Sequence, residues 1–346
     1  MKLLICTQVL DRNDPYLGFM HGWFEELARN VESLTIICLK EGEHSLPANV
    51  HIYSLGKEKV PAPQGAMIYH GTLRRLKYAT LFYRYIWRVR TKHDAVLVHM
   101  NQEYILLGGW LWKLLGKRLY MWRNHYAGTF LTDISAFFCT KVFCTSRYSY
   151  TAKYKKTVLM PIGVDPRFAP PSSPPASGSI LFFGRLAPSK RPSLLLEALA
   201  LLRGEQWSAD FYGPGEASYV ASLKQKAVPL RERVKFLGPV PHHEAPTVFG
   251  AHEIYVNLGG SGMYDKTIFE AAACGCLVLA ASEDFAKLVD QRFTFKQDDA
   301  EDLAQKLHVL LKVSKEEKRV LQSNLKQLAE TQSLQKLISR LVKELQ

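Results

Sequence analysis

Short apolar runs rich in branched residues alternate with longer amphipathic segments along the whole chain. In the first half the apolar runs include LLICTQV, LTIICL, AVLVHM, RLYMW and KVFCTS, and helical patterns such as GWFEELARN lie between them. In the second half SILFFG, ADFYG, VKFLG, IYVNL and LVLAA alternate with the helical patterns PSLLLEALALL, TIFEAAAC and AEDLAQKLHVLLK. Repeated alternation of this kind is typical of α/β proteins with parallel, doubly wound sheets.

The length and one Pro-rich segment divide this pattern into two domains. With 346 residues the chain is long enough for two separate cores. The segment GVDPRFAPPSSPPASGS cannot sustain a helix or a central strand. We predict a first domain over residues 1–165, a linker over 166–179, a second domain over 180–325, and a C-terminal helix over 326–346 that packs back on the first domain. Two such domains are expected to bind a ligand in the cleft between them, where their strands end.

Composition indicates a soluble protein with anionic partners. No apolar run approaches the roughly 20 residues of a transmembrane helix. The opening MKLLICTQVLDRND is better interpreted as a first strand than as a signal peptide, which predicts a cytoplasmic protein. The net charge is +13, and residues 1–165 hold 22 Lys and Arg against 12 Asp and Glu. This excess favours a nucleic acid, an anionic membrane or a phosphorylated substrate as partner of the N-terminal half.

A cationic loop follows the first strand of the second domain. The strand ends at Gly184, Arg185 and Lys190 follow in the loop, and a helix begins near Pro192. Free amide groups at a helix start, together with two cations, suit a diphosphate. The alternative is an ordinary solvated loop.

A second anion-binding pattern lies further along, in IYVNLGGSGMYDKTIFEAAACGCLVLAA. A strand runs into the Gly-rich loop 259–262, and the helix that starts near Lys266 carries Glu270. Glycines let backbone amides approach a ligand closely, and a glutamate can accept hydrogen bonds from ribose hydroxyls. Alternatively, Glu270 only complements the helix dipole.

These segments resemble, in order, the retaining glycosyltransferases of family 4, which have the fold called GT-B. The matching parts are a Pro-Ile-Gly-Val-Asp turn (161–165), strand-Gly-Arg-Leu-x-x-x-Lys, Phe-Tyr-Gly-x-Gly (211–215), Val-x-Phe-Leu-Gly (234–238), and the Gly-rich loop followed by Ala-x-Gly-x-x-Val-x-Ala (273–280). The resemblance covers about residues 160–310 well and the N-terminal half loosely. It implies a fold of two Rossmann-like domains and a nucleoside-diphosphate sugar, such as a UDP- or GDP-sugar, as donor.

The resemblance also implies roles for individual residues. Arg185 and Lys190 are expected to bind the donor diphosphate and stabilise the leaving nucleotide, and Glu270 to hold the donor ribose. The set expected to contact the donor is Gly184, Arg185, Lys190, Gly262, Met263, Tyr264, Asp265, Lys266 and Glu270. The family motif usually has a glutamate where this chain has Gly262. Asp265 and Lys266 are candidates to replace its contacts, although Asp265 is also suited to be the N-cap of the following helix.

Four residues of the N-terminal half are candidate site residues, Gly18 and His21 for the acceptor and His99 and His125 for catalysis. Gly18 and His21 lie in the loop and helix that follow the first strand, and His99 and His125 end two later strands. Strand carboxyl ends gather ligand-binding residues in such sheets. In the family a histidine at about the place of His99 or His125 lies beside the transferred sugar. The alternative for each histidine is a structural or surface role.

Retention of configuration requires the acceptor to attack from the face that the nucleotide leaves. The leaving diphosphate can take the acceptor proton, so catalysis needs positioning and charge stabilisation rather than a pair of carboxylates. The sequence shows no metal cluster, and the cationic loop makes a divalent ion unnecessary. We therefore expect neither a metal nor another cofactor.

The segment GTLRRLKYATLFYRYIWRVRTKH interleaves basic and aromatic residues. On a helix its basic residues form one stripe and its apolar residues another, a pattern that suits an anionic membrane surface. The candidate membrane contacts are Arg74, Lys77, Arg84, Trp87 and Arg88. A domain helix with a solvated basic face is the alternative.

The function predicted is transfer of a sugar to a glycan or lipid-linked acceptor, in polysaccharide or glycoconjugate biosynthesis, at the inner face of the membrane or in the cytoplasm. The alternative is a catalytically degenerate GT-B scaffold that binds glycan, membrane or a partner, which the missing motif glutamate favours. A nucleic-acid-binding protein is excluded because no recognition motif is present.

Overall fold

The structure is a computed structural model that describes residues 1–59, 72–262 and 265–346, with the side chains of 72–74 left aside. The chain divides into two units. The first contains Met1–Met160 and Leu337–Gln346, and the second contains Pro161–Lys336. Each unit is built on a parallel sheet, as the alternation of strands and helices predicts.

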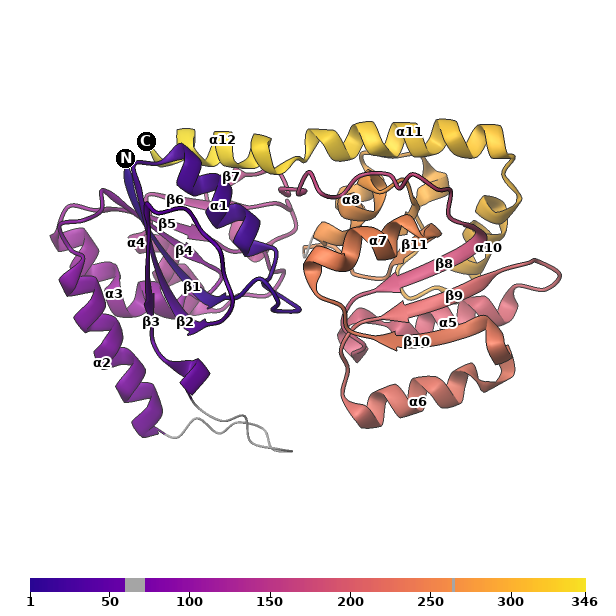
Figure 1. Cartoon of the computed structure of the whole chain (residues 1–346), viewed down its shortest axis with the longest axis horizontal. Coiled ribbons are helices and arrows are strands. Elements are labelled where there is room, and N and C mark those ends of the chain that lie inside the picture. The colour runs from indigo at the N-terminus through magenta and orange to yellow at the C-terminus, as the bar shows by residue number, and fades with distance from the viewer. Residues whose placement is uncertain (60–71, 263–264) are drawn as a thin grey trace. The chain divides into compact units, whose positions relative to one another are not determined.

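The first unit carries a seven-stranded sheet in the order β3-β2-β1-β4-β5-β6-β7 (Figure 1). Its elements are β1 (Lys2–Leu10), α1 (Met20–Asn30), β2 (Ser33–Glu41), β3 (Val50–Ser54), α2 (Thr72–Arg88), β4 (Ala95–His99), α3 (Glu103–Leu114), β5 (Arg118–Trp122), α4 (Phe130–Phe138), β6 (Lys141–Cys144), β7 (Thr157–Leu159) and α12 (Leu334–Leu345).

Alternation along β5 shows how helices cover both faces of this sheet. Leu119 and Met121 are buried in one core with residues of α2, α3 and α4. Tyr120 and Trp122 point to the other face. There the hydroxyl of Tyr120 donates to the carbonyl of Leu345 in α12 at 3.2 Å, and the ring of Trp122 lies 4.8 Å from that of Trp23 in α1.

The second unit carries a five-stranded sheet in the order β10-β9-β8-β11-β12. Its elements are β8 (Ala176–Phe183), α5 (Pro192–Leu201), β9 (Ser208–Tyr212), α6 (Ala217–Ala227), β10 (Val234–Gly238), α7 (Ala245–Gly250), β11 (His252–Asn257), α8 (Lys266–Ala273), β12 (Leu277–Ala280), α9 (Glu283–Ala286), α10 (Ala300–Lys312) and α11 (Lys315–Thr331).

The segment predicted as a linker is partly folded into the second unit. Of residues 166–179, the last four already belong to β8. Phe168 is 5% exposed, and its ring lies 6.1 Å from Phe249 and 5.2 Å from His242. A buried aromatic side chain anchors this Pro-rich stretch, which composition alone does not reveal.

The predicted C-terminal helix is two helices. α11 begins at Lys315 and ends at Thr331, after which α12 starts at Leu334. The carbonyl of Gln332 accepts hydrogen bonds from the amides of Gly163 and Val164, at 2.9 and 2.8 Å. The chain leaves the helical path at Gln332 because its backbone pairs with residues 163–164 there.

A buried ion pair fastens α11 to the sheet. Lys318 donates to Glu253 at 2.8 Å, and the two side chains are 11% and 10% exposed. The second carboxylate oxygen of Glu253 accepts from the amide of Gly178 at 2.7 Å. Removal of one member of such a pair leaves an uncompensated buried charge.

We expect Lys318→Met to lower the free energy of unfolding by about 3 kcal/mol, because Glu253 would remain buried without its cation. Urea denaturation followed by circular dichroism measures this change. Arg319→Met is the matched control, since the ion pair of Arg319 is 79% and 83% exposed and its removal is expected to cost less than about 0.5 kcal/mol. Equal losses in the two variants would contradict the assignment.

Candidate functional site

The two anion-binding segments of the second unit leave neighbouring strands. β8 and β11 pair directly, and the sheet order reverses between them, because β9 and β10 lie on one side of β8 and β12 lies beyond β11. The carboxyl ends at such a switch point form the crevice where open α/β sheets bind ligands. The loop 184–191 follows β8 and the loop 258–265 follows β11, so the sequence prediction for both loops converges on one edge of the sheet.

The cationic loop is held close to the neighbouring strand. The amide of Gly184 donates to the carbonyl of Tyr212 at 3.0 Å. Gly213 has φ +144°, and a Cβ built on it would lie 1.8 Å from the carbonyl oxygen of Gly184. Only glycine allows this approach. Arg185 follows with an exposed side chain, and α5 begins at Pro192 after Arg191 in the left-handed conformation.

Lys190 connects the two loops. Its ammonium donates to both carboxylate oxygens of Asp265, at 2.8 and 2.7 Å, and each of the two side chains is 20% exposed. The amide of the Asn257 side chain donates to the same carboxylate at 3.1 Å, and its oxygen accepts from the amide of Gly259 at 3.0 Å. Asp265 is also the N-cap residue of α8 by position, but its side chain makes no cap hydrogen bond. The carboxylate is used for Lys190 instead.

The Gly-rich loop is closely packed, and one of its positions has a backbone conformation that favours glycine. A Cβ on Gly259 would lie 2.7 Å from the Asp265 carboxylate, and one on Gly260 would lie 2.8 Å from the side-chain oxygen of Gln297. Gly262 has φ +88°, a conformation that strains any other residue. The glutamate that the resemblance leads one to expect at Gly262 would therefore be strained on the backbone of this chain. Met263 and Tyr264 lie outside the described residues.

Glu270 lies deeper than the sequence indicates. Its side chain is 2% exposed, His242 lies 2.9 Å from its Oε1, and Lys266 lies 3.4 Å from the same atom. Burial by itself raises the pKa of Glu270, but Lys266 and His242 together outweigh burial and hold that pKa below its ordinary value. The pKa of Lys266 is lowered, chiefly by burial, while Glu270 opposes the shift. Lys266 and His242 thus contact the same carboxylate oxygen of Glu270.

Sequence reasoning missed His242 and Asn257. His242 lies in the loop after β10, 28 residues before Glu270, and no periodic pattern marks it. Asn257 is the last residue of β11 and is 5% exposed. A polar residue that ends an otherwise apolar strand was the available signal for Asn257.

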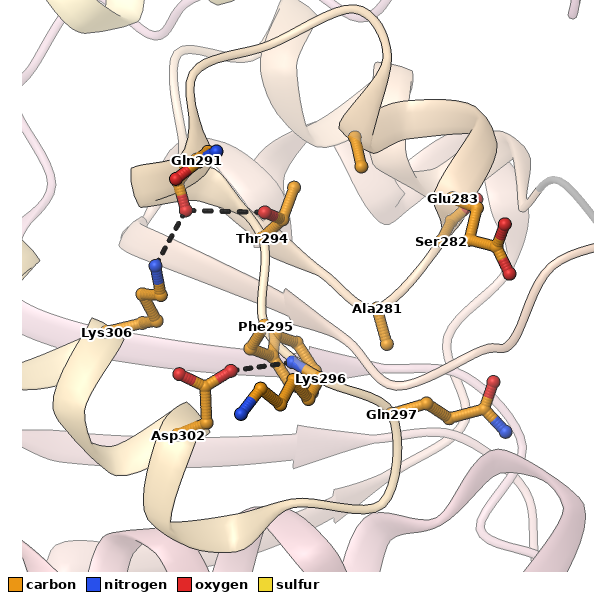
Figure 2. A pocket seen from close by; sticks show the side chains of 11 residues that line it. Ala281, Ser282, Glu283, Gln291, Thr294, Phe295, Lys296, Gln297, Asp302 and Lys306 are labelled. Atoms are coloured by element: carbon orange, nitrogen blue, oxygen red, sulfur yellow. Dashed lines mark hydrogen bonds between the residues drawn. The ribbon is translucent and has the colours of Figure 1, made fainter.

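A cavity of about 580 Å³ lies beside the Gly-rich loop (Figure 2). The amide of Glu283, which lines the cavity, donates to the hydroxyl of Ser261 at 3.0 Å. Figure 2 shows that the side chains of Lys306 and Thr294 donate hydrogen bonds to the backbone carbonyl of Gln291. The backbone amide of Lys296 donates to the carboxylate of Asp302. The volume suits a small molecule. Neither Arg185 nor Lys190 is among the residues that line this cavity.

In the first unit the candidates also lie near a switch point, which here falls between β1 and β4. The loop after β1 folds tightly at Gly18, where a Cβ would lie 2.6 Å from the carbonyl oxygen of Asp14. His99 ends β4, is 4% exposed, and packs against Phe19 and Trp23 with ring centroids 6.4 and 6.0 Å away. The fold therefore brings His99 next to the segment that follows Gly18.

The other two histidines have structural contacts. His21 accepts from the amide of Ser45 at 3.1 Å through Nε2. His125 is half-buried, accepts from the amide of Ala127 at 2.9 Å through Nδ1, and stacks on Tyr126 at 4.6 Å. These contacts orient both rings without assigning them a role.

Burial lowers the pKa of His99 to about 4. The Nδ1 atom has no hydrogen-bond partner in the described part of the chain. We expect His99 to remain neutral at neutral pH, because protonation would bury a charge among apolar rings. Histidine-selective NMR titration, assigned with a His99→Gln variant, should show no titration of this ring between pH 8 and 5.5. A midpoint near 6.5 would contradict the burial that the structure shows.

The predicted membrane-contact residues lie on α2. Lys77, Arg84 and Arg88 are exposed, Trp87 is 54% exposed, and the side chain of Arg74 lies outside the described residues. Phe82 and Ile86 form the buried face of the helix. The guanidinium of Arg90 lies 4.4 Å from the ring of Trp87. The outer face of α2 is basic, which both interpretations of this segment predict.

Membrane-spanning helices and metal-ligand groups are both absent from residues 1–59, 72–262 and 265–346. No helix among them is both long and apolar enough to cross a membrane. Nor do residues 1–59, 72–262 and 265–346 contain a group of three or more His, Cys, Asp or Glu side chains placed to hold a metal ion.

Known proteins resemble this chain in sequence and in fold. The family model described as Glycosyl transferases group 1 matches residues 177–313. The "Putative glycosyltransferase YtcC" of Bacillus subtilis (strain 168) is 31% identical over 88 residues, which is 22% of this chain and 21% of that protein. The alignment thus spans about a fifth of the curated relative.

Solved structures match over the whole length. Anabaena Alr3699/HepE, solved in complex with UDP, has a TM-score of 0.78 and 18% identity over 100% of this chain and 99% of its own. The sucrose-phosphate synthase of Thermosynechococcus elongatus has a TM-score of 0.75 and 16% identity over 99% and 98% of the two chains. At such identities the likeness shows the fold, two Rossmann-like domains of the GT-B type.

Proposed function

We propose that this chain moves a sugar from a nucleoside-diphosphate sugar to an acceptor, because residues 177–313 are similar to the family described as Glycosyl transferases group 1. The observation that carries the proposal is the Lys190–Asp265 ion pair, which holds a cation beside the Gly-rich loop where β8 and β11 end. A cation, close backbone amides and a helix start in one place suit a diphosphate. UDP bound to HepE, whose fold is similar, supports a UDP-sugar as donor, and a GDP-sugar is the second candidate.

In this proposal Arg185 and Lys190 bind the diphosphate directly. Asp265 holds the ammonium of Lys190 in place, and the side-chain amide of Asn257 donates to the same carboxylate. An incoming diphosphate shares Lys190 with Asp265 through charge-assisted hydrogen bonds. Lys266 and Asp265, the two candidates to replace the motif glutamate, then differ in role, because Lys266 faces Glu270 and Asp265 faces Lys190.

We assign Glu270 a positioning role. Its Oε1 is occupied by His242 and Lys266 at 2.9 and 3.4 Å, so a ribose contact has only the other oxygen available. The carboxylate fixes the two neighbouring side chains at the start of α8 and after β10. The resemblance predicts instead that Glu270 binds the donor ribose.

The proposed reaction proceeds with retention of configuration. The bond between the anomeric carbon and the diphosphate oxygen breaks, and a bond to the acceptor hydroxyl oxygen forms on the same face. The acceptor proton passes to the leaving diphosphate oxygen, so charge balances without a pair of protein carboxylates. Arg185 and Lys190 stabilise the negative charge that develops on the leaving group.

The acceptor we propose is a glycan or a lipid-linked sugar, in polysaccharide or glycoconjugate biosynthesis on the cytoplasmic side of a membrane. The supporting observation is the exposed basic face of α2, with Lys77, Arg84 and Arg88, which suits a phosphorylated lipid or an anionic surface. His99 and His125 are the proposed residues nearest the transferred sugar, His99 as a neutral ring.

A non-catalytic GT-B scaffold is the second candidate, favoured by Gly262 in place of the motif glutamate. The backbone of Gly262 has a φ of +88°, a conformation that suits glycine better than glutamate. The scaffold hypothesis predicts binding of glycan or membrane without nucleotide binding.

Calorimetric titration of UDP, GDP and their sugar conjugates distinguishes the transferase hypothesis from the scaffold hypothesis. Binding of one nucleotide that is lost in Arg185→Ala and kept in Lys226→Ala supports the transferase, since the Lys226 side chain is 53% exposed in a surface ion pair with Glu197. Absence of nucleotide binding by folded protein would reject it and favour the scaffold.

A further inference from the structure

The outer faces of α3 and α4 in the first unit are apolar, where those of surface helices are ordinarily polar. On α3, Trp110 and Leu114 are 47% and 77% exposed. On α4, Phe130 and Phe137 are 74% and 78% exposed. Spacings of four and seven residues place each pair on one face of its helix. Large apolar side chains exposed to this extent mark an interaction surface.

The two helices lie close enough to form one surface. The hydroxyl of Thr132 donates to the side chain of Gln102 at 2.7 Å, near the starts of both helices. Further along, a Cβ built on Gly109 would lie 3.2 Å from the ring of Phe138. The helices therefore run in the same direction, and their outer side chains form one apolar patch, defined here as Trp110, Leu114, Phe130 and Phe137.

The inner faces of both helices already supply the core. Tyr104, Ile105 and Trp112 of α3 and Ala136 of α4 are buried against the sheet. The outer apolar residues are thus additional to what the domain fold requires. Among the residues of α3 only Glu103 and Lys113 are charged, and α4 carries only Asp133.

Positive charge borders the patch. Lys113 is exposed between Trp110 and Leu114. Lys156 lies at the end of α4, where its ammonium donates to the carbonyl of Cys139 at 2.7 Å. The carboxylate of Asp133 is compensated by Lys153 at 2.8 Å. On the other side, the hydroxyl of Tyr83 in α2 donates to the carbonyl of Leu107 at 2.8 Å, so the basic outer face of α2 adjoins α3.

We propose that the apolar patch docks this protein on an anionic lipid bilayer. Tryptophan side chains suit the headgroup level of a bilayer, and leucine and phenylalanine suit the acyl boundary beneath it. Lys113, Lys156 and the cations of α2 then contact lipid phosphates. The proposal goes beyond sugar transfer and locates the apolar contacts on α3 and α4, whereas sequence reasoning placed membrane contact on α2 alone. A second copy of this chain is the competing occupant of the patch.

Co-sedimentation of the full chain with vesicles tests the proposal. Binding is expected to phosphatidylcholine vesicles that contain phosphatidylglycerol, and weaker binding to phosphatidylcholine alone. Leu114→Glu with Phe137→Glu should weaken binding at least about tenfold, because two charges enter the apolar boundary. Lys113→Gln should weaken binding about fivefold and only to the anionic vesicles. Leu201→Glu and Val320→Glu, at positions 50% and 53% exposed in the second unit, are the matched controls and should bind as the wild type.

A local readout comes from tryptophan fluorescence quenched by brominated lipids. The part of the quenching that Trp110 contributes should disappear in Trp110→Phe. Circular dichroism and nucleotide calorimetry on each variant show whether the fold and the second unit are intact, so a failure of this proposal is distinguishable from a failure of the transferase proposal. No vesicle binding by folded wild type, or binding unaffected by the two glutamates, would overturn the proposal. So would a wild-type dimer that the two glutamates convert to a monomer without any vesicle binding.

Discussion

Lys190→Ala is expected to lower kcat/KM by a factor of about 100 to 1000, the range found when one preorganised donor to a developing charge is removed. Lys190 is the cation that both loops of the switch point hold in place, at 2.7–2.8 Å from Asp265. Its interaction strengthens as the diphosphate leaves, so most of the loss should fall on kcat. Steady-state kinetics with the nucleotide sugar that calorimetry identifies measures the change.

Two further variants make this result specific. Lys226→Ala removes an exposed lysine of the same unit and should leave kcat/KM unchanged. Asp265→Asn keeps the shape of the side chain but removes the charge that holds Lys190, so a smaller loss is expected, and the double variant should lose less than the sum of the two. A full-rate Lys190→Ala enzyme would contradict the assignment of Lys190 to the diphosphate.

The overall fold was predictable because the signal is local. Apolar strand runs and amphipathic helices alternate along both halves, and this alternation predicts parallel sheets covered by helices. The Gly184–Lys190 loop and the loop around Gly262 could also be located, since glycines and cations directly follow apolar strands. Element ends were less certain, as Phe168 and Gln332 show. Their tertiary contacts, rather than local propensity, decide where the linker and the last helix begin.

The contacts within the site could not be predicted in the same way. Lys190 and Asp265 are 75 residues apart, and their ion pair depends on β8 lying next to β11, a strand order that the sequence does not encode locally. His242 reaches Glu270 from the loop after β10 for the same reason. The apolar outer faces of α3 and α4 escaped notice because a helix that is apolar all round ordinarily indicates burial.

Glu270→Ala is the second large effect that we expect, and it concerns stability as well as activity. The substitution leaves Lys266, whose side chain is 16% exposed, without the carboxylate that lies 3.4 Å away. A buried cation that loses its partner costs about 3 kcal/mol of unfolding free energy. Activity should also fall, because Lys266 and His242 lose the group that positions them. Glu197→Ala removes an exposed partner of Lys226 and is the matched control, with an expected change below about 0.5 kcal/mol.

The pH dependence separates the charge of Glu270 from its packing. In the folded chain the pKa of Glu270 is held below its ordinary value by Lys266 and His242, although burial opposes them. The unfolded chain therefore takes up the proton first as pH falls, and the stabilisation is complete above the unfolded pKa of about 4.3 and is lost below it. Glu270→Gln lacks this contribution, so its urea midpoint should lie well below that of the wild type at pH 7 and approach it as the pH falls below 4. A constant difference between the two proteins across this range would mean that shape, and not the charge beside Lys266, is what Glu270 contributes.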